Sequence, residues 1–138
     1  MSEKFDEREL EEVRNFFASD KYATEATGIV IEAVRSGFAR VSLNVEARHR
    51  NAAGLVMGAV YYTMADFAFA VAANFDRPLT LTVTSSISFL NPARGKILYA
   101  EARLRKAGRR SCTAEVAVSD DCGTDVAIVT LNGMTIAE

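Results

Sequence analysis

The sequence predicts an α+β fold, in which a run of antiparallel strands covers one long, buried helix. Residues 55–75 are apolar on nearly every side, as expected of a helix that lies inside a protein. Several other segments alternate apolar and polar residues with a period of two, which is typical of strands with one wet face. The 138 residues have the length of one domain and can bury roughly two-thirds of the surface that the unfolded chain exposes.

Composition excludes several classes of protein. Apolar residues make up 49 % of the chain and charged residues 25 %, which is too apolar for a disordered segment and favours an oligomer. The net charge of −2 offers no basic excess for a nucleic acid. Cys112, Cys122 and the single histidine, His49, are too few for a disulfide framework or a zinc site. The acidic N-terminus contains no apolar signal segment, so we expect a cytoplasmic protein.

We expect one domain over residues 1–138, with an N-terminal helix within residues 1–20 and the core within residues 21–138. Asp6 and Glu9 form a capping pair at the start of that helix. We expect the helix to lie across the rest of the domain through an apolar stripe of Leu10, Val13, Phe16 and Phe17.

Six segments have the residue pattern of strands, namely 28–35, 38–48, 79–90, 96–106, 111–119 and 125 to about 136. Strict alternation in the third of them places five hydroxyl side chains on one face, those of Thr80, Thr82, Thr84, Ser86 and Ser88. A sheet built from these strands covers one side of the central helix. A second copy of the chain is the simplest cover for the other side.

The central apolar segment has two interpretations. A membrane span is one, but Asp66 lies in its middle and strands flank it, so we favour a helix buried in the domain. A carboxylate in such a helix is costly unless it is paired or kept for function. Asp66 either bonds Tyr62 or a backbone group and fixes the packing, or it is a functional acid.

The start of this helix is a second candidate site. Its free backbone N–H groups and the positive end of the helix dipole suit an oxyanion or a polarised carbonyl, and Gly58 lets a ligand approach. Alternatively, Gly54 and Gly58 only permit tight packing. Asp66 follows Gly58 by eight residues, or about 12 Å of helix, so one carbonyl cannot reach both. If both act together, the site spans the interface of two antiparallel copies.

The stretch HRNAAGLVMGAVYYTMAD resembles the signature of hotdog-fold acyl-CoA thioesterases of the PaaI-like, phenylacetic-acid-degradation family. The later stretch FLNPARGKILYAEARLRKAGRRSCTAEVAVSD is also similar to that family, and the likeness covers about residues 25–137. It implies an antiparallel sheet of about six strands wrapped around one central helix. It also implies a homodimer at least, with a homotetramer as the expected assembly, and hydrolysis of an acyl-CoA without a metal or other cofactor.

The resemblance also implies roles for single residues. Asp66 corresponds to the carboxylate that activates water or attacks the thioester, and Asn51 to the asparagine that helps to position water and thioester. Gly58 corresponds to the glycine whose N–H polarises the thioester carbonyl. Thr82 falls where relatives have a hydroxyl that orients water. In the family, the asparagine and glycine come from one subunit and the carboxylate and hydroxyl from the other.

Some positions depart from the family pattern. Met57 replaces a histidine beside the thioester and Ala59 replaces a second glycine. Thr82 shares its strand face with four similar side chains, so that face is alternatively a wet or interfacial one. His49 matches the motif, although a lone histidine beside a loop also fits a structural role. Cys112 is expected in the core.

The substrate is expected to contact two sets of residues. The acyl group would lie between two long helices, against His49, Met57, Tyr61, Phe67 and Phe69. Cationic side chains suit the phosphates of coenzyme A, although the same residues also fit a solvated turn. These are Arg94, Arg105, Lys106, Arg109 and Arg110.

The sequence therefore favours a thioesterase acting on aryl- or medium-chain acyl-CoA. A non-catalytic acyl-CoA-binding protein of the same fold is the alternative, and the replacement at Met57 keeps it open. A hotdog hydratase or dehydratase is a third possibility, but such enzymes pair a histidine with the carboxylate, and His49 is a poor candidate for that partner.

Overall fold

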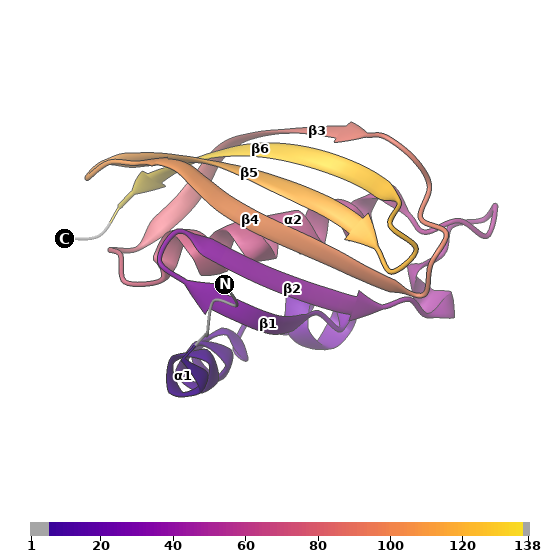
Figure 1. The fold of residues 1–138 in the computed structure, drawn as a ribbon, viewed down its shortest axis with the longest axis horizontal. Helices are drawn as coiled ribbons and strands as arrows, with labels where there is room; N and C mark the ends of the chain where they lie inside the picture. Colours follow the sequence, from indigo (N-terminus) through magenta and orange to yellow (C-terminus); the bar gives the residue numbers. More distant parts are fainter. Residues whose placement is uncertain (1–5, 137–138) are drawn as a thin grey trace.

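A six-stranded antiparallel sheet curls around one long helix in the computed structural model, which describes residues 6–136 (Figure 1). The strand order is β1-β2-β4-β5-β6-β3, so β1 and β3 form the two edges. The fold class is as the sequence predicts. Residues 1–5 and 137–138 of the expected domain lie outside the described residues. The elements are α1 (Glu7–Phe17), β1 (Val30–Arg35), β2 (Phe38–Asn44), α2 (Gly58–Asn74), β3 (Thr80–Phe89), β4 (Ile97–Ala107), β5 (Ser111–Asp120) and β6 (Asp125–Thr135).

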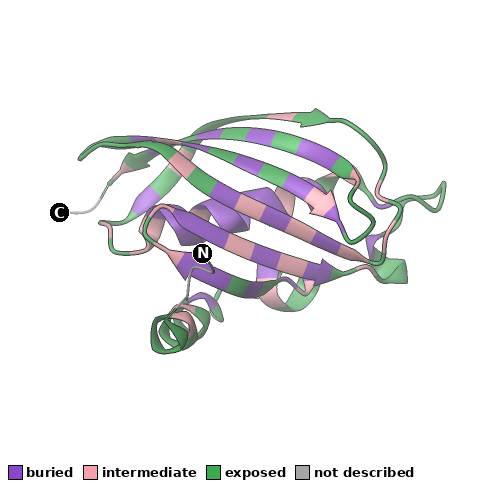
Figure 2. Ribbon diagram, viewed as in Figure 1, coloured by how far each residue is buried: buried purple, intermediate pink, exposed green. Residues whose placement is uncertain are grey.

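The core lies between α2 and the concave side of the sheet (Figure 2). Met64, Ala68 and Val71 of α2 are fully buried, as are Leu98 of β4 and Leu131 of β6. Small residues such as Ala68 allow the sheet to approach the helix closely, as close packing of an interior requires. Among the described helices none is both long and apolar enough to cross a membrane.

His49 sets the ends of two elements. Its Nδ1 accepts a hydrogen bond from the Glu46 backbone N–H (2.9 Å), and its own carbonyl accepts one from Met57 N–H (2.9 Å). These bonds fold the chain into a short 3-10 turn, η2 (Ala47–His49), and keep Met57 out of the helix. Therefore β2 ends at residue 44 rather than 48, and α2 spans residues 58–74 rather than 55–75.

A single π-helical turn, η1 (Tyr22–Thr27), precedes the first strand and was not predicted. Gly28 ends the turn with φ of 91°, a conformation that glycine adopts at little cost. The buried His49 ring donates from Nε2 to the Thr27 carbonyl (2.7 Å), which ties the turn to the chain after β2. The first strand consequently begins at Val30, two residues later than the pattern predicts.

A β-bulge in β3 interrupts the predicted alternation. Thr82 pairs with Gly133 of β6, whereas Thr84 pairs with Asn132, so Val83 is the extra residue. Gly133 faces the core, where an added Cβ would lie 2.9 Å from the Phe69 ring. Cross-strand partners share a face, so Thr82 points inward and Thr84 outward. The expectation that all five hydroxyls share one face is therefore wrong.

Helix α1 lies beside the edge strand β1 rather than across the domain (Figure 1). The Asp6 side chain caps it by accepting from Arg8 N–H (2.9 Å). Arg14 Nε donates to the Ile31 carbonyl of β1 (2.8 Å), and Phe17 is buried with its ring edge-on to Phe67. Leu10 and Val13 of the predicted stripe pack partly against the core, but Phe16 is 72 % exposed.

Asp120 joins the two loops at one end of the sheet. Its Oδ2 accepts from the backbone N–H groups of Arg94 (2.7 Å) and Gly95 (2.9 Å), and its Oδ1 accepts from Cys122 (3.0 Å) and Thr124 (2.8 Å). Burial alone would raise the pKa of Asp120, but the N–H donors of Arg94, Thr124 and Gly95 lower it well below its ordinary value. The ionised carboxylate is therefore part of the fold.

Asp120→Asn is expected to lower the free energy of unfolding by about 2–4 kcal/mol, because two buried N–H donors lose their acceptor. Denaturant unfolding at pH 7 measures the loss. A folded-state pKa below the unfolded value means that the contribution is present above about pH 4 and is lost as the pH falls further. The difference between wild type and variant should shrink in acid.

Asp125→Asn is the control, because Asp125 is exposed and its side chain has no partner among the described residues. Its unfolding free energy should stay within about 0.5 kcal/mol of the wild type. Equal losses in the two variants would contradict the role given to Asp120.

Candidate functional site

One strip of α2 is left open by the sheet. Ala59, Tyr62, Thr63, Asp66 and Ala70 recur at helical spacing, and none of them is buried. The sequence indicated a helix buried all round with an acid inside it, so the structure corrects that expectation. Asp66 is exposed on the open strip in the single chain. Because Asp66 is exposed, the fold does not have to stabilise a fully buried charge there. The carboxylate is also accessible to a ligand.

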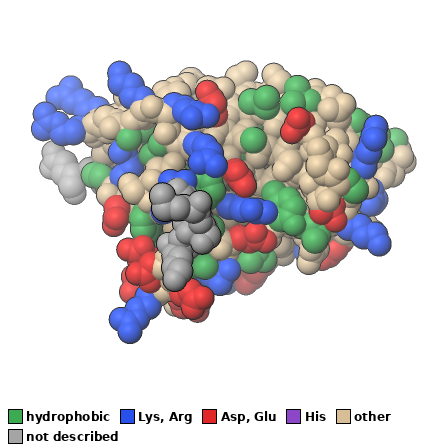
Figure 3. Space-filling model, viewed as in Figure 1, with side chains coloured by type: hydrophobic (Ala, Val, Ile, Leu, Met, Phe, Trp, Pro, Cys, Tyr) green, Lys and Arg blue, Asp and Glu red, His purple; other side chains and the backbone are tan. Residues whose placement is uncertain are grey.

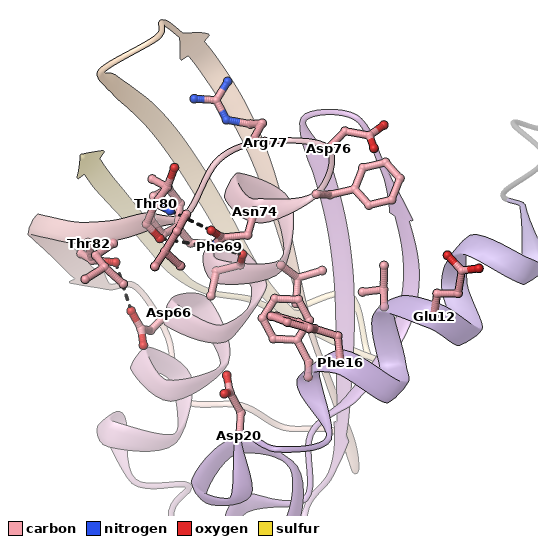
Figure 4. Close-up of a pocket in the computed structure, with 17 residues that line it drawn as sticks. Glu12, Phe16, Asp20, Asp66, Phe69, Asn74, Asp76, Arg77, Thr80 and Thr82 are labelled. Atoms are coloured by element: carbon pink, nitrogen blue, oxygen red, sulfur yellow. Dashed lines mark hydrogen bonds between the residues drawn. The ribbon is translucent and has the colours of Figure 1, made fainter. Parts of the chain in front are cut away.

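Thr82 of β3 lies against this carboxylate. Its hydroxyl donates a long hydrogen bond to Asp66 Oδ1 (3.4 Å), and the two side chains point toward each other (Figure 4). Tyr62, the partner that a purely structural Asp66 would take, instead shares a hydrogen bond with Ser85 Oγ (2.7 Å). Asp66 and Thr82 thus form a pair built from the helix and the bulged edge strand.

Three effects act on the pKa of Asp66. The protein around the carboxylate removes part of its hydration and raises the pKa, the Thr82 hydroxyl lowers it, and the negative charge of Asp20 raises it again. The net result is a pKa above the ordinary value. Lys21, which lies near the same carboxylate, is paired with Glu25 (2.8 Å). A carboxylate of this kind is a better base than one in water.

A groove of about 880 Å³ starts at Asp66 and Thr82 and runs along the C-terminal half of α2 (Figure 4). Helix α1 forms one wall with Phe16 and Phe17, and the start of β3 forms the other with Leu79 and Leu81. The floor is made by four residues of α2 and by Phe75 directly after it, the four being Phe69, Ala70, Val71 and Asn74. An apolar groove that ends at a carboxylate can take a hydrophobic group whose reactive end is polar.

The start of α2 presents the second predicted feature. Met57 occupies the N-cap without a capping side chain, and the N–H groups of Gly58 and Ala59 have no acceptor among the described residues. Asn51 Oδ1 accepts from the N–H groups of Ala53 (2.9 Å) and Leu55 (3.1 Å), so it shapes the loop before the helix. The N–H group of Gly58 lies eight residues before Asp66, which is about 12 Å along the helix axis.

The glycines of this region also have structural reasons. A Cβ at Gly58 would lie 3.0 Å from the Phe89 ring, so the packing alternative is present beside the functional one. Gly54 has φ of 81° and open space around it, so its backbone conformation rather than packing requires glycine. Neither glycine alone identifies a ligand site.

Only one of the predicted acyl contacts lines the groove. Phe69 does so, whereas Tyr61 is buried in the core, where its Oη accepts from Ala93 N–H (3.2 Å). Phe67 is buried against Phe17 and lines a smaller hollow that it shares with Asp66. Met57 is 53 % exposed at the start of α2. His49 is buried and both ring nitrogens are bonded to the backbone, so it cannot contact a substrate in this arrangement.

The predicted coenzyme A contacts fall at two ends of one strand. Arg94 precedes β4, while Arg105, Lys106, Arg109 and Arg110 lie where β4 turns into β5, about 33 Å away along the strand. Basic side chains gather over that hairpin (Figure 3). Arg105 pairs with Glu115 (3.2 Å), and the other four basic residues are exposed. One protomer cannot bring both groups to the same phosphates.

Three residues of the groove and the open strip's surroundings were not among the predicted site residues. Asp20 and Phe16 line the groove, and Ser85 bonds Tyr62. The sequence pattern places Phe16 in the apolar stripe of α1, and Asp20 lies in the link after that helix, where no local pattern marks it. Cys112 is buried in the core as expected, whereas Cys122 is exposed.

Comparisons with known proteins place the chain in a family. Residues 53–127 match the model of the thioesterase superfamily, so the chain belongs to that superfamily. A relative from Archaeoglobus fulgidus named "Putative esterase" is 28 % identical over 120 residues, covering 86 % of this chain and 78 % of its own length.

Solved structures share the fold. The Escherichia coli PaaI protein from the phenylacetic acid degradation operon superposes with a TM-score of 0.86 at 24 % identity, over 94 % of this chain and 95 % of its own. A thioesterase protein of Streptococcus pneumoniae, solved with coenzyme A, has a TM-score of 0.81 at 19 % identity, over 88 % of this chain and 98 % of its own. The hotdog arrangement expected from the sequence is confirmed.

The pKa of Asp66 should move in opposite directions when its two neighbours are changed. Thr82→Val removes the bond that favours the charged form and should raise the pKa, whereas Asp20→Asn removes a like charge and should lower it. A ¹³C NMR titration of the Asp66 carboxyl carbon measures both shifts. Thr84→Val, on the outer face of the sheet, should leave the pKa unchanged. Shifts of the same sign in the first two variants would contradict this account.

Proposed function

We propose that the chain is an acyl-CoA thioesterase, with Asp66 as its catalytic carboxylate. The observation that carries the proposal is the Asp66–Thr82 pair at one end of an apolar groove. Membership of the thioesterase superfamily supports the reaction class. An aryl- or medium-chain acyl group would fill the groove with its thioester beside the carboxylate. The chemistry needs water as the co-substrate and no cofactor.

The reaction follows from what the Asp66 carboxylate and the Thr82 hydroxyl can each do. Asp66 takes a proton from water that the Thr82 hydroxyl helps to orient, and the water oxygen bonds to the thioester carbon. Alternatively the carboxylate itself bonds to that carbon and water releases the acid afterwards. In both routes the C–S bond breaks, coenzyme A leaves as its thiolate, and Asp66 passes the proton that it took from water to that thiolate. The carbonyl oxygen becomes negative on the way and needs N–H donors.

The free N–H groups at Gly58 and Ala59 are suitable donors, but they lie too far from Asp66 in the same chain. We therefore propose a homodimer in which the start of one α2 meets Asp66 of a second copy. Asn51 would stand beside the thioester from the same side as Gly58. Strand β3 supports this assembly, because it is a sheet edge whose Leu81, Val83 and Phe89 are exposed.

The dimer also allows a common site for coenzyme A. Within one chain the β4–β5 hairpin and Arg94 are separated by the length of β4, whereas two antiparallel copies bring opposite ends together. We propose that Lys106, Arg109 and Arg110 of one copy meet the phosphates beside Arg94 of the other. A pair of dimers, forming a tetramer, remains our expectation for the full assembly. The structure of a fold neighbour with coenzyme A supports this class of ligand.

Hydrolysis is better supported than hydration or dehydration. The chain has one histidine, and both nitrogens of the His49 ring are already bonded to the backbone, at Glu46 and at Thr27. No histidine is therefore available to pair with Asp66. This leaves the carboxylate, its hydroxyl neighbour and water as the reacting groups.

Asp66→Asn is expected to lower thioester hydrolysis by roughly 10²–10⁴-fold, because the amide can neither accept the proton nor attack. Thiol release from a panel of short, medium, long and aryl acyl-CoA esters measures the rate. Asp125→Asn is the matched control and should keep wild-type activity. Wild-type turnover by Asp66→Asn would refute its role. Tight binding of the esters without hydrolysis by the wild type would instead favour a non-catalytic acyl-CoA-binding protein.

Val83→Lys should give a monomer and remove activity, because it places charges on both copies of the β3 edge. Val83 is 59 % exposed, and Val30, on the opposite edge of the sheet, is 52 % exposed. Val30→Lys is therefore the matched control and should stay dimeric and active. Light scattering after gel filtration gives the mass. A wild-type monomer with full activity would refute the shared site.

A further inference from the structure

The groove beside Asp66 is apolar along its length and acidic around its rim. Four carboxylates line it, those of Glu12, Asp20, Asp66 and Asp76, against the one guanidinium of Arg77. The negative charge of Asp20 is felt at Asp66, so at least one rim charge acts across the groove. A second anion placed between these carboxylates would meet like charges from more than one side.

The single cation does not offset these charges inside the groove. Arg77 donates from its guanidinium to the Gly108 carbonyl of the β4–β5 hairpin (3.0 Å). Figure 4 shows this group directed away from Phe16 and Phe69. Lys21, which lines the neighbouring hollow with Asp20, is paired with Glu25 (2.8 Å). A carboxylate lying along the groove floor would therefore approach Asp20 and Glu12, while both nearby cations are bonded to other groups.

The walls fit an extended hydrophobic group. From Asp66 to Asn74 the floor follows about 12 Å of helix, most of which an acetyl group would leave uncovered. Phe16 stands at the rim with its ring edge-on to Phe17 (centroids 5.1 Å apart), which itself packs against Phe67. An exposed phenyl ring that lines a groove gains apolar contact when a ligand covers it.

We propose that this groove selects uncharged acyl groups of medium length or with an aromatic ring, and rejects acyl groups that end in a carboxylate. Phe16 of α1 is the specificity residue for the hydrophobic part, and Glu12 and Asp20 reject the anion. The inference rests on the proposed thioesterase function, because it assumes that the thioester lies at Asp66. It assigns the N-terminal helix to substrate choice.

The test compares hexanoyl-CoA with adipoyl-CoA, which have the same chain length and differ by one terminal carboxylate. Calorimetry with the Asp66→Asn variant measures dissociation constants without turnover. Adipoyl-CoA should bind at least about tenfold more weakly, since its carboxylate is both desolvated and repelled. Adding Glu12→Gln and Asp20→Asn should narrow that ratio by about threefold. Adding Glu11→Gln, which removes a charge from another face of α1, should leave it unchanged.

Phe16 is tested with the same method. Phe16→Ala should weaken hexanoyl-CoA binding by about fivefold and leave acetyl-CoA binding unchanged, whereas Phe16→Leu should retain most of the affinity because it keeps apolar contact. Equal binding of hexanoyl- and adipoyl-CoA, or a ratio unaffected by the Glu12 and Asp20 changes, would overturn the selection by charge. Equal loss for acetyl- and hexanoyl-CoA in Phe16→Ala would overturn the role of Phe16.

These outcomes are separate from the proposed function. If the wild type hydrolyses hexanoyl-CoA but both esters bind alike, the thioesterase stands and the selection fails. If the binding ratio is as expected but the wild type releases no thiol from any ester, the selection stands and the proposed hydrolysis fails.

Discussion

The sheet can wrap α2 on most sides but cannot close around it, and the rest of the structure depends on this constraint. Six strands leave two edges, and between them one strip of the helix faces outward. Residues on the covered sides are apolar or small because they are packed without space for water. The one charged residue of α2, Asp66, lies on the open strip. The site is therefore placed by the incomplete closure of the fold.

Strand β3 links this site to the expected assembly. Its bulge turns Thr82 toward Asp66, while the strand itself remains an unpaired edge with exposed apolar side chains. Both features belong to the same short segment, so changes in edge pairing would be felt at the Asp66–Thr82 pair. This makes the proposed dimer and the proposed chemistry mutually dependent.

Two other polar residues, His49 and Asp120, have all their polar side-chain atoms bonded to the backbone. These atoms are therefore not free to bind a ligand. His49 uses both ring nitrogens to fix the loops around α2, and Asp120 uses both oxygens to join two turns. Each satisfies buried backbone groups that would otherwise be costly. Asp66 differs from them because its hydrogen bond is long and its surroundings raise its pKa. A weakly held carboxylate is the one that can exchange partners with a substrate.

The sequence by itself determined the fold class, the central helix and the strands, because apolar periodicity reflects burial along each segment. It also indicated Asp66, since a charge in an apolar helix stands out locally. Only the tertiary structure decided that Thr82 faces this acid, because the bulge depends on the pairing with Gly133 across the sheet. The exposure of Phe16 and the approach of Asp20 likewise arise from how α1 docks beside β1. Such contacts join segments distant in sequence, and a local pattern contains no information about them.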